Sequence, residues 1–226
     1  MNPNRSSCIF QKRFPRRIAI LALCLGLVLS SCGGRTETAR TNTADSSRTV
    51  MLFGTISRIT LADHATQENF DAAISSLEAV DDLINRNRPD SELGLVNALA
   101  GVSPVSVSTE LLDLMEVALH YADLTDGAFN PAIGPLVDLW GIMTDHAHVP
   151  TQEEIAMVLP LLDWKDIEMD RTNSTLYLKK KGMSLDFGAI GKGYAADQVR
   201  GVLREKGVSS AIINLGGNVF AMGAKT

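Results

Sequence analysis

Apolar and polar residues form several distinct patterns along the 226-residue chain. Over residues 50–62, β-branched and other apolar residues alternate with polar ones, which predicts a strand. From Thr66, apolar residues recur every three or four positions as far as Ile84, which is the period of a helix. The sequence therefore predicts a strand and then an amphipathic helix that is ended by Pro89.

Two more helices are predicted in the middle of the chain from their start signals. Ser108 is a suitable N-cap for a helix whose apolar positions continue to Ala122. Thr151 and Glu154 have the spacing of a capping box, so a short helix begins there and ends at Pro160. Residues 125–131 lie between these helices and are too rich in turn-forming residues to be regular.

The last third of the chain predicts several short strands and one helix. Residues 167–169 and 175–178 flank a polar turn and are predicted to form a hairpin. Residues 183–187 predict a further short strand, which leads into a helix from about residue 191 to residue 206. Two closing strands, 211–214 and 219–222, are separated by a pair of glycines. This mixed order predicts an α+β fold rather than a repeating βαβ sheet.

Residues 1–31 have the features of a lipoprotein signal peptide. Basic residues precede an apolar run, residues 18–29, that is shorter than the roughly 20 residues needed to cross a membrane. The junction Leu29-Ser30-Ser31-Cys32 resembles the bacterial lipobox, in which the cysteine is lipidated and becomes the first residue. We therefore expect an exported protein that Cys32 anchors to a bacterial membrane, at the inner membrane facing the periplasm or elsewhere in the envelope. An ordinary signal peptide that ends near a cysteine is the alternative.

Residues 32–48 are expected to form a lipidated, flexible tether, because no large apolar residue occurs there. The remaining residues, 49–226, are numerous enough to form one domain with its own core.

Charge, cysteine content and histidine context argue against several classes of function. The net charge is −5, but residues 1–31 hold five of the 21 basic residues and no acid, which leaves 16 basic against 26 acidic residues. The resulting net charge of about −10 argues against a nucleic-acid binder, since phosphate neutralisation needs clustered Lys and Arg. No cysteine follows Cys32, which excludes a disulfide framework, a cysteine nucleophile and a thiolate metal site in the mature chain. His146 and His148 are expected to be loop residues that face water rather than a metal pair.

The stretch from Ser184 to Asp197 is the most informative candidate for chemistry. A predicted strand ends at Asp186, glycines follow, and Lys192 falls in the first turn of a predicted helix. The free N–H groups and positive end of such a helix, together with a lysine, can bind an anion. The glycine spacing matches neither a Walker A loop nor a dinucleotide fingerprint. The alternative is that Asp186 caps the helix, Lys192 is solvated and the glycines only permit close packing.

Several segments together resemble the FAD:protein FMN transferase (ApbE-like) family. They are the run 186–197, Gly127-Ala128-Phe129-Asn130-Pro131 with residues 134–141, Ser91-Glu92-Leu93 with Asn97, and residues 214–218. The resemblance spans nearly all of residues 51–226 and includes the lipoprotein signal. It implies a T-fold-like α+β domain that binds FAD and Mg²⁺ and transfers FMN to a threonine of an acceptor flavoprotein, releasing AMP. Some members instead hydrolyse FAD to FMN and AMP.

The resemblance also implies roles for individual residues. Asp186 and Lys192 would be the catalytic pair that contacts FAD, and Ala189 would offer its backbone carbonyl to the metal. The flavin site would be lined by Ala128, Phe129 and Asn130.

Three departures from the family pattern bear on these roles. Phe53 stands at a cofactor-site position where the family commonly has Met, which keeps an apolar contact. Asn87 stands where a tyrosine often stacks on the flavin; its loss exposes the phosphate to water and favours hydrolysis. The family also continues past the position of Thr226 into a segment that holds the remaining metal ligands, so we expect a domain that is incomplete at its C-terminus. An FAD pyrophosphatase and a non-enzymatic flavin-binding lipoprotein are therefore the alternatives.

Overall fold

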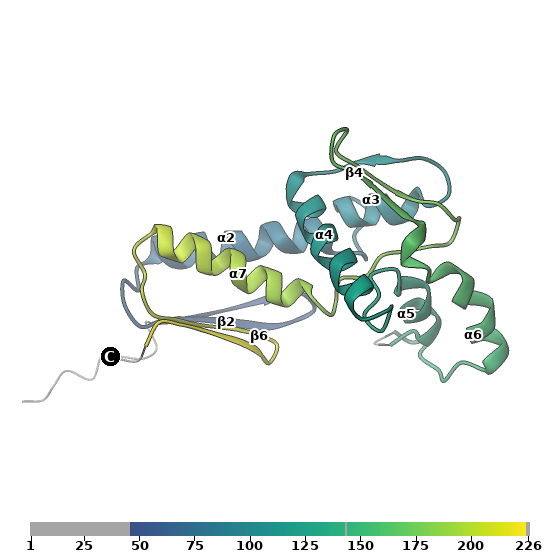
Figure 1. Ribbon diagram of the computed structural model, residues 1–226. Helices are drawn as coiled ribbons and strands as arrows, with labels where there is room; N and C mark the ends of the chain where they lie inside the picture. The colour runs from purple at the N-terminus through teal and green to yellow at the C-terminus, as the bar shows by residue number, and fades with distance from the viewer. Residues whose placement is uncertain (1–45, 143, 225–226) are drawn as a thin grey trace, which may run out of the picture. The chain divides into compact units, whose positions relative to one another are not determined.

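The computed structural model describes residues 46–142 and 144–224. Within them, a four-stranded antiparallel sheet has the order β1-β2-β6-β7, and a three-stranded sheet has the order β3-β5-β4. Helices are interspersed with these strands (Figure 1), which confirms the predicted α+β fold. The predicted signal peptide, Cys32 and nearly all of the predicted tether lie outside the described residues. None of the helices in residues 46–142 and 144–224 is long and apolar enough to cross a membrane.

The first predicted strand is wrong, because residues 47–61 form a hairpin of two strands. β1 (Ser47–Leu52) pairs with β2 (Thr55–Leu61), and Leu52 lies opposite Thr55. The two turn residues, Phe53 and Gly54, have φ angles of 54° and 65°, the left-handed conformation that a two-residue hairpin turn requires. β1 also includes the last two residues of the predicted tether, so the folded part begins earlier than predicted.

Two long helices cover one face of the larger sheet. Figure 1 shows α2 (Gln67–Ile84) and α7 (Gly191–Glu205) side by side on it, with β6 (Ala211–Leu215) and β7 (Asn218–Met222) forming the predicted closing hairpin. The N-cap of α2 is Thr66, as predicted, and the helix ends at Ile84, before Pro89. The core between sheet and helices consists of fully buried apolar residues, including Ile59, Leu61, Phe70, Leu77, Val199, Leu203, Ile213 and Leu215.

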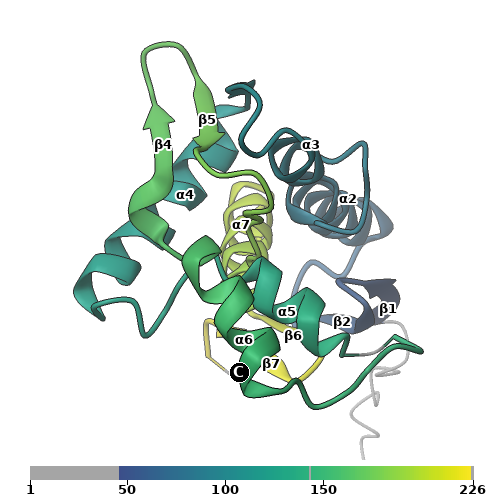
Figure 2. The same cartoon turned by 90° about the vertical axis from the view of Figure 1, so that its right-hand side faces the viewer.

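The smaller sheet consists of β3 (Val105–Ser106), β5 (Thr175–Leu178) and β4 (Ile167–Asp170). Figure 2 shows the predicted β4–β5 hairpin, with β5 next to α3 (Glu92–Ala98). α4 (Thr109–Leu124) and α6 (Gln152–Val158) begin at the predicted caps, Ser108 and Thr151. α3 and α5 (Gly134–Trp140) were not predicted. Seven residues are too few for an apolar period to be recognised, and neither helix has the capping-box spacing that revealed the equally short α6.

Residues 183–187 form an extended segment but no strand, so that prediction is wrong. The backbone N–H and C=O of Leu185 bond to the side chain of Asn97, at 2.7 and 3.1 Å, and the Asp186 N–H donates to the Pro131 carbonyl at 2.9 Å. These partners replace a sheet ladder. Met183, Leu185 and Phe187 are buried, while Asp186 between them is only partly buried.

Candidate active site

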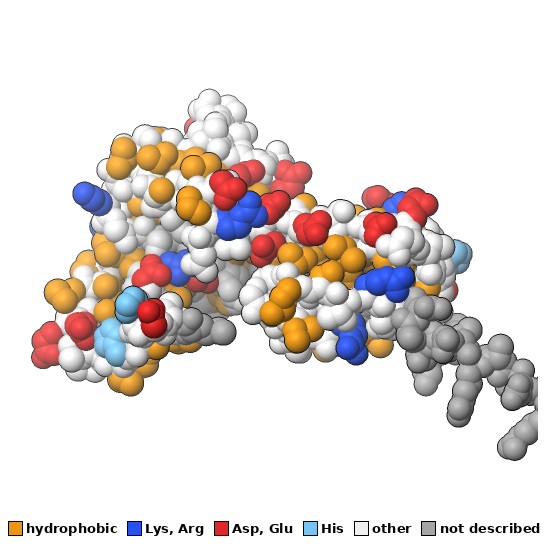
Figure 3. Space-filling view, turned by 180° about the vertical axis from the view of Figure 1, so that it is seen from behind, with side chains coloured by type: hydrophobic (Ala, Val, Ile, Leu, Met, Phe, Trp, Pro, Cys, Tyr) orange, Lys and Arg blue, Asp and Glu red, His pale blue; other side chains and the backbone are white. Residues whose placement is uncertain are grey.

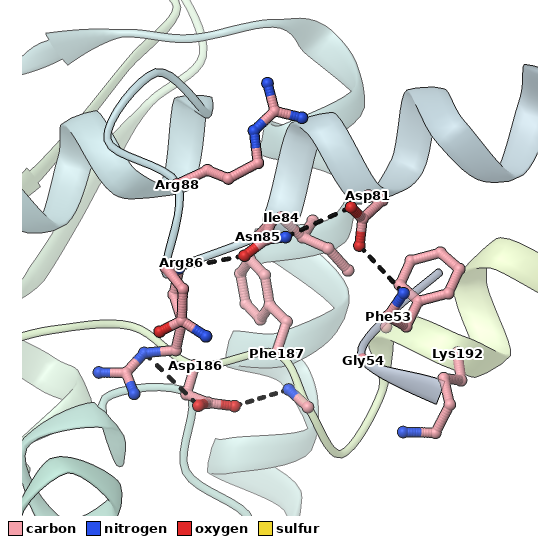
Figure 4. A pocket seen from close by; sticks show the side chains of 13 residues that line it. Phe53, Gly54, Asp81, Ile84, Asn85, Arg86, Arg88, Asp186, Phe187 and Lys192 are labelled. Carbon is pink, nitrogen blue, oxygen red and sulfur yellow. Dashed lines mark hydrogen bonds and ion pairs between the residues drawn. The ribbon is translucent and has the colours of Figure 1, made fainter. Parts of the chain in front are cut away.

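A cavity of about 380 Å³ lies where the β1–β2 turn, the C-terminal end of α2 and the turn before α7 meet (Figure 4). It is lined by Phe53, Gly54, Asp81, Ile84, Asn85, Arg86, Asn87, Arg88, Asp186, Phe187, Gly188, Gly191 and Lys192. Four residues that the sequence singled out therefore meet here: Phe53, Asn87, Asp186 and Lys192. They come from three segments that are far apart in the sequence.

Lys192 lies in the first turn of α7 at the edge of this cavity. Its ammonium group makes no hydrogen bond or ion pair within the described part of the chain. The N-cap of α7, Ile190, has no side-chain hydrogen bond to the helix, and the N–H groups of Lys192 and Gly193 have no acceptor among residues 46–142 and 144–224. A free lysine beside unpaired N–H groups at the positive end of a helix can bind an anionic group.

Asp186 is fixed by contacts with two other residues of the cavity. Its Oδ1 accepts a hydrogen bond from the Gly188 N–H at 2.7 Å, and its Oδ2 lies 3.6 Å from the Nε of Arg86. The N-cap of α7 is Ile190, so the alternative prediction that Asp186 caps this helix is wrong. A carboxylate in this position can accept hydrogen bonds from a ligand.

Two arginines of the cavity were not singled out from the sequence. Arg86 donates from Nη2 to Asp138 Oδ2 at 2.7 Å and also faces Asp186 (Figure 4). Arg88 pairs with Asp82 and with Asp90, and these bonds raise the pKa of Arg88 and lower the pKa of Asp90. The sequence feature that could have identified them is their position on either side of Asn87, just after a predicted helix.

A chain of hydrogen bonds connects the hairpin turn to the loop that contains Asn87. Asp81 on α2 accepts from the Phe53 N–H at 3.2 Å through Oδ1 and from the Asn85 side chain at 3.3 Å through Oδ2. Asn85 in turn accepts from the Asn87 N–H at 3.1 Å. Phe53 and Asn87, which the sequence assigned to the same site, are thus held by one network.

The other predicted flavin-site residues do not line the cavity. Ala128 is exposed, Phe129 packs half-buried against the core, and the side chain of Asn130 bonds to the Leu162 carbonyl and the Ala132 N–H. The carbonyl of Pro131 connects their loop to the site by accepting from the Asp186 N–H. A flavin contact for these three residues stays a prediction.

The predicted metal ligand, Ala189, is exposed in the turn before α7, and its carbonyl accepts no backbone hydrogen bond within the described residues. No group of three His, Cys, Asp or Glu side chains is arranged to hold a metal in residues 46–142 and 144–224. Mg²⁺ requires octahedral oxygen coordination. The carbonyl of Ala189 would supply one of these oxygens, so the described residues alone do not complete a magnesium site.

His146 and His148 lie far out at the surface, as predicted. The side chain of His146 is 85% exposed and that of His148 is 47% exposed, and their ring nitrogens lie 3.5 Å from Asp145 and 3.7 Å from Glu154. Figure 3 shows histidine side chains at the surface beside acidic groups. Both contacts are exposed to solvent.

Comparisons with known proteins agree with the resemblance seen in the sequence. The family model of the ApbE family matches residues 53–226. An FAD:protein FMN transferase of Treponema pallidum is 35% identical over 98% of this chain and 60% of its own length. A protein of the same name from Klebsiella pneumoniae is 41% identical over 66% of this chain and 48% of its own length.

Solved structures show the same fold. The ApbE protein of Thermotoga maritima aligns with a TM-score of 0.73 at 27% identity, over 79% of this chain and 59% of its own. The flavin transferase ApbE of Vibrio cholerae aligns with a TM-score of 0.70 at 27% identity, over the same shares. The chain thus spans about 60% of the length of the first curated relative. On the family match and on these structures, this chain belongs to the ApbE family.

Proposed function

We propose that this protein is an FAD:protein FMN transferase, which moves FMN from FAD to a threonine hydroxyl of an acceptor flavoprotein and releases AMP. The observation that best supports the proposal is the cavity, in a chain of the ApbE family, at which Lys192 has no partner among the described residues. A cationic, unpaired group beside free backbone N–H groups suits the pyrophosphate of FAD.

In this reaction the threonine oxygen forms a bond to the FMN phosphorus, the bond from that phosphorus to the bridging oxygen breaks so that this oxygen leaves with AMP, and the hydroxyl proton is released to solvent. Negative charge spreads over the phosphate oxygens in the transition state, so positioned positive groups accelerate the step. Lys192 and the N–H groups at the start of α7 would neutralise that charge. Asp186, held by Gly188 and Arg86, would accept a hydrogen bond from a hydroxyl of FAD and orient it.

Magnesium dependence is part of the proposal, on the strength of the family resemblance and of the free carbonyl of Ala189. When bound, a divalent cation would polarise a phosphate oxygen. The described residues would add only this one oxygen to its coordination, so the dependence is to be tested directly by adding Mg²⁺ or a chelator.

FAD hydrolysis is a second candidate, and the position of Asn87 favours it. Asn87 lines the cavity at the place where the family often has a tyrosine. An amide does not shield the flavin phosphate from water as an aromatic ring would. With water as the nucleophile, the same cleavage gives free FMN and AMP.

One assay separates these candidates. The purified chain is incubated with FAD and Mg²⁺, with or without an acceptor protein, and with the acceptor's target threonine replaced by valine as the control. AMP together with FMN fluorescence that survives denaturing electrophoresis supports transfer. AMP with only free FMN refutes transfer in favour of hydrolysis, and FAD binding without AMP refutes both in favour of a flavin-binding protein. The Asp186→Ala variant should lose the product in either case.

We also propose that the protein is exported and anchored to a bacterial membrane by lipid on Cys32, on the basis of the lipobox-like sequence. Cells that express the chain would be labelled with an alkynyl palmitate analogue and fractionated. Label on the membrane-bound protein that disappears in Cys32→Ser supports the anchor. Unlabelled protein in the soluble fraction would contradict it.

A further inference from the structure

Arg86 lies between two carboxylates that come from different parts of the chain. Its Nη2 donates to Asp138 of α5 at 2.7 Å, and its Nε lies 3.6 Å from Asp186 Oδ2. The side chains of Arg86 and Asp186 are only 15% and 16% exposed, whereas that of Asp138 is 62% exposed. Asp138 is therefore the solvent-exposed partner of Arg86, and Asp186 is the more buried one.

The Nε of Arg86 is buried and has no hydrogen-bond acceptor among the described residues. A buried N–H without an acceptor destabilises a protein, and 3.6 Å is too long for a hydrogen bond. Figure 4 shows this nitrogen directed at the carboxylate of Asp186. A shift of about 0.7 Å would bring the two atoms to the distance of an ordinary N–H···O bond. The geometry thus pairs this donor with Asp186.

Without Arg86, Asp186 would have no ion-pair partner among the described residues, and it lines a cavity that, on the proposed function, admits the pyrophosphate of FAD. A carboxylate and a phosphate repel each other, and the repulsion grows as less water lies between them. We infer that Arg86 is a positioning residue for this reaction: it holds the Asp186 carboxylate in place and compensates its charge, so that FAD can bind. Asp138 holds the guanidinium of Arg86 in position through its hydrogen bond to Nη2. This inference rests on the proposed function and adds a residue to it.

Four variants test the inference. Arg86→Met removes the charge, Arg86→Lys keeps the charge without the planar fork, and Asp138→Asn weakens the anchor. Arg171→Met is the matched control, because Arg171 also bridges two carboxylates, Asp113 and Glu116, at a surface away from the cavity. FAD affinity is measured by flavin fluorescence quenching, AMP release is measured on the folded protein, and the melting temperature is recorded for each variant.

Arg86→Met is expected to raise the Kd for FAD about tenfold or more, the usual size of a lost charge-assisted contact. Arg86→Lys is expected to bind FAD more tightly than Arg86→Met but less tightly than the wild type. Asp138→Asn is expected to raise the Kd less than Arg86→Met does, and Arg171→Met is expected to leave the Kd unchanged. A purely structural role would lower the melting temperature of Arg86→Met while the folded fraction kept its FAD affinity. That result would overturn the inference.

A double-mutant cycle with Asp186→Asn gives a stricter criterion. If Arg86 acts through the Asp186 charge, then Arg86→Met should change the Kd less than about threefold in the Asp186→Asn background. Fully additive effects would show that Arg86 acts on FAD by another route and would refute the positioning role.

An NMR experiment keeps this test separate from the proposed function. Should the wild-type chain neither bind FAD nor release AMP, the proposed function fails, yet the pairing can still be observed. The ¹⁵N–¹H resonance of the Arg86 Nε is expected to move in Asp186→Asn and to stay in place in Asp113→Asn. A resonance that does not respond to Asp186→Asn overturns the inference.

Discussion

Replacement of Asn97 by alanine should destabilise the domain strongly, although the change removes only one polar side chain. Asn97 lies on α3, and its amide bonds to both backbone groups of Leu185, accepting from the N–H at 2.7 Å and donating to the C=O at 3.1 Å. Leu185 is fully buried. It belongs to the extended segment that places Asp186, and in the described residues no strand takes over these two bonds.

The expected magnitude follows from the two backbone groups that lose their partner. Each buried, unpaired N–H or C=O costs about 1–3 kcal/mol, so the variant should lose about 3 kcal/mol of unfolding free energy. For a domain of this size, each kcal/mol lowers the melting temperature by roughly 2–4 °C, which gives a fall of about 6–12 °C. FAD binding should weaken too, because the position of Asp186 depends on this segment.

Urea denaturation and thermal melting of the wild type, Asn97→Ala and the control Asn173→Ala measure this effect. Asn173 lies exposed in the β4–β5 turn, where its side chain bonds to no described residue other than Asp170, so its loss should change stability by no more than about 0.5 kcal/mol. Equal destabilisation by the two alanines would refute the reasoning. So would a large loss for Asn97→Ala with unchanged affinity for FAD, since Asp186 would then not depend on this contact.

Three further predictions concern α7, the Asp63 carboxylate and the free lysine. Gly201→Ala, whose new Cβ meets nothing within 4 Å, should gain about 0.5–1 kcal/mol of unfolding free energy by urea denaturation. Gly191→Ala should gain less, because its new Cβ would lie 2.5 Å from the terminal Cδ1 of Ile84, which would have to shift. Hydrogen bonds from a serine hydroxyl and two backbone N–H groups lower the pKa of Asp63, so its stabilising effect is present at neutral pH and is lost as the pH falls below 3.8. Urea denaturation over that pH range should therefore show a smaller loss of unfolding free energy for Asp63→Asn than for the wild type. Lys192→Met should weaken FAD binding about tenfold or more by fluorescence quenching, while the exposed control Lys181→Met should not.

The sequence predicted the helices whose start and period are both local properties. α2, α4 and α6 begin at residues that cap them in the structure, because the cap and the first turn lie within four residues of each other. The prediction was wrong for residues 50–62, where the β-branched pattern continues through a two-residue turn. Phe53 hid that turn, since an aromatic residue is an unusual choice for a positive φ angle. Residues 183–187 have the alternation of a strand, yet their hydrogen bonds go to a side chain and a loop.

The site was only partly predictable, and the reason is the distance in sequence between its partners. Asp186 and Lys192 were found because a carboxylate, glycines and a helix start are adjacent in the chain. Arg86 was missed because its partner Asp138 is 52 residues away, on a helix that the sequence did not predict. Asn97 was part of a segment that resembles the family, but its role depends on its contact with Leu185, 88 residues along the chain. Residues adjacent in sequence can therefore identify the group that meets the ligand, whereas the residues that hold this group in place are identified only from the fold.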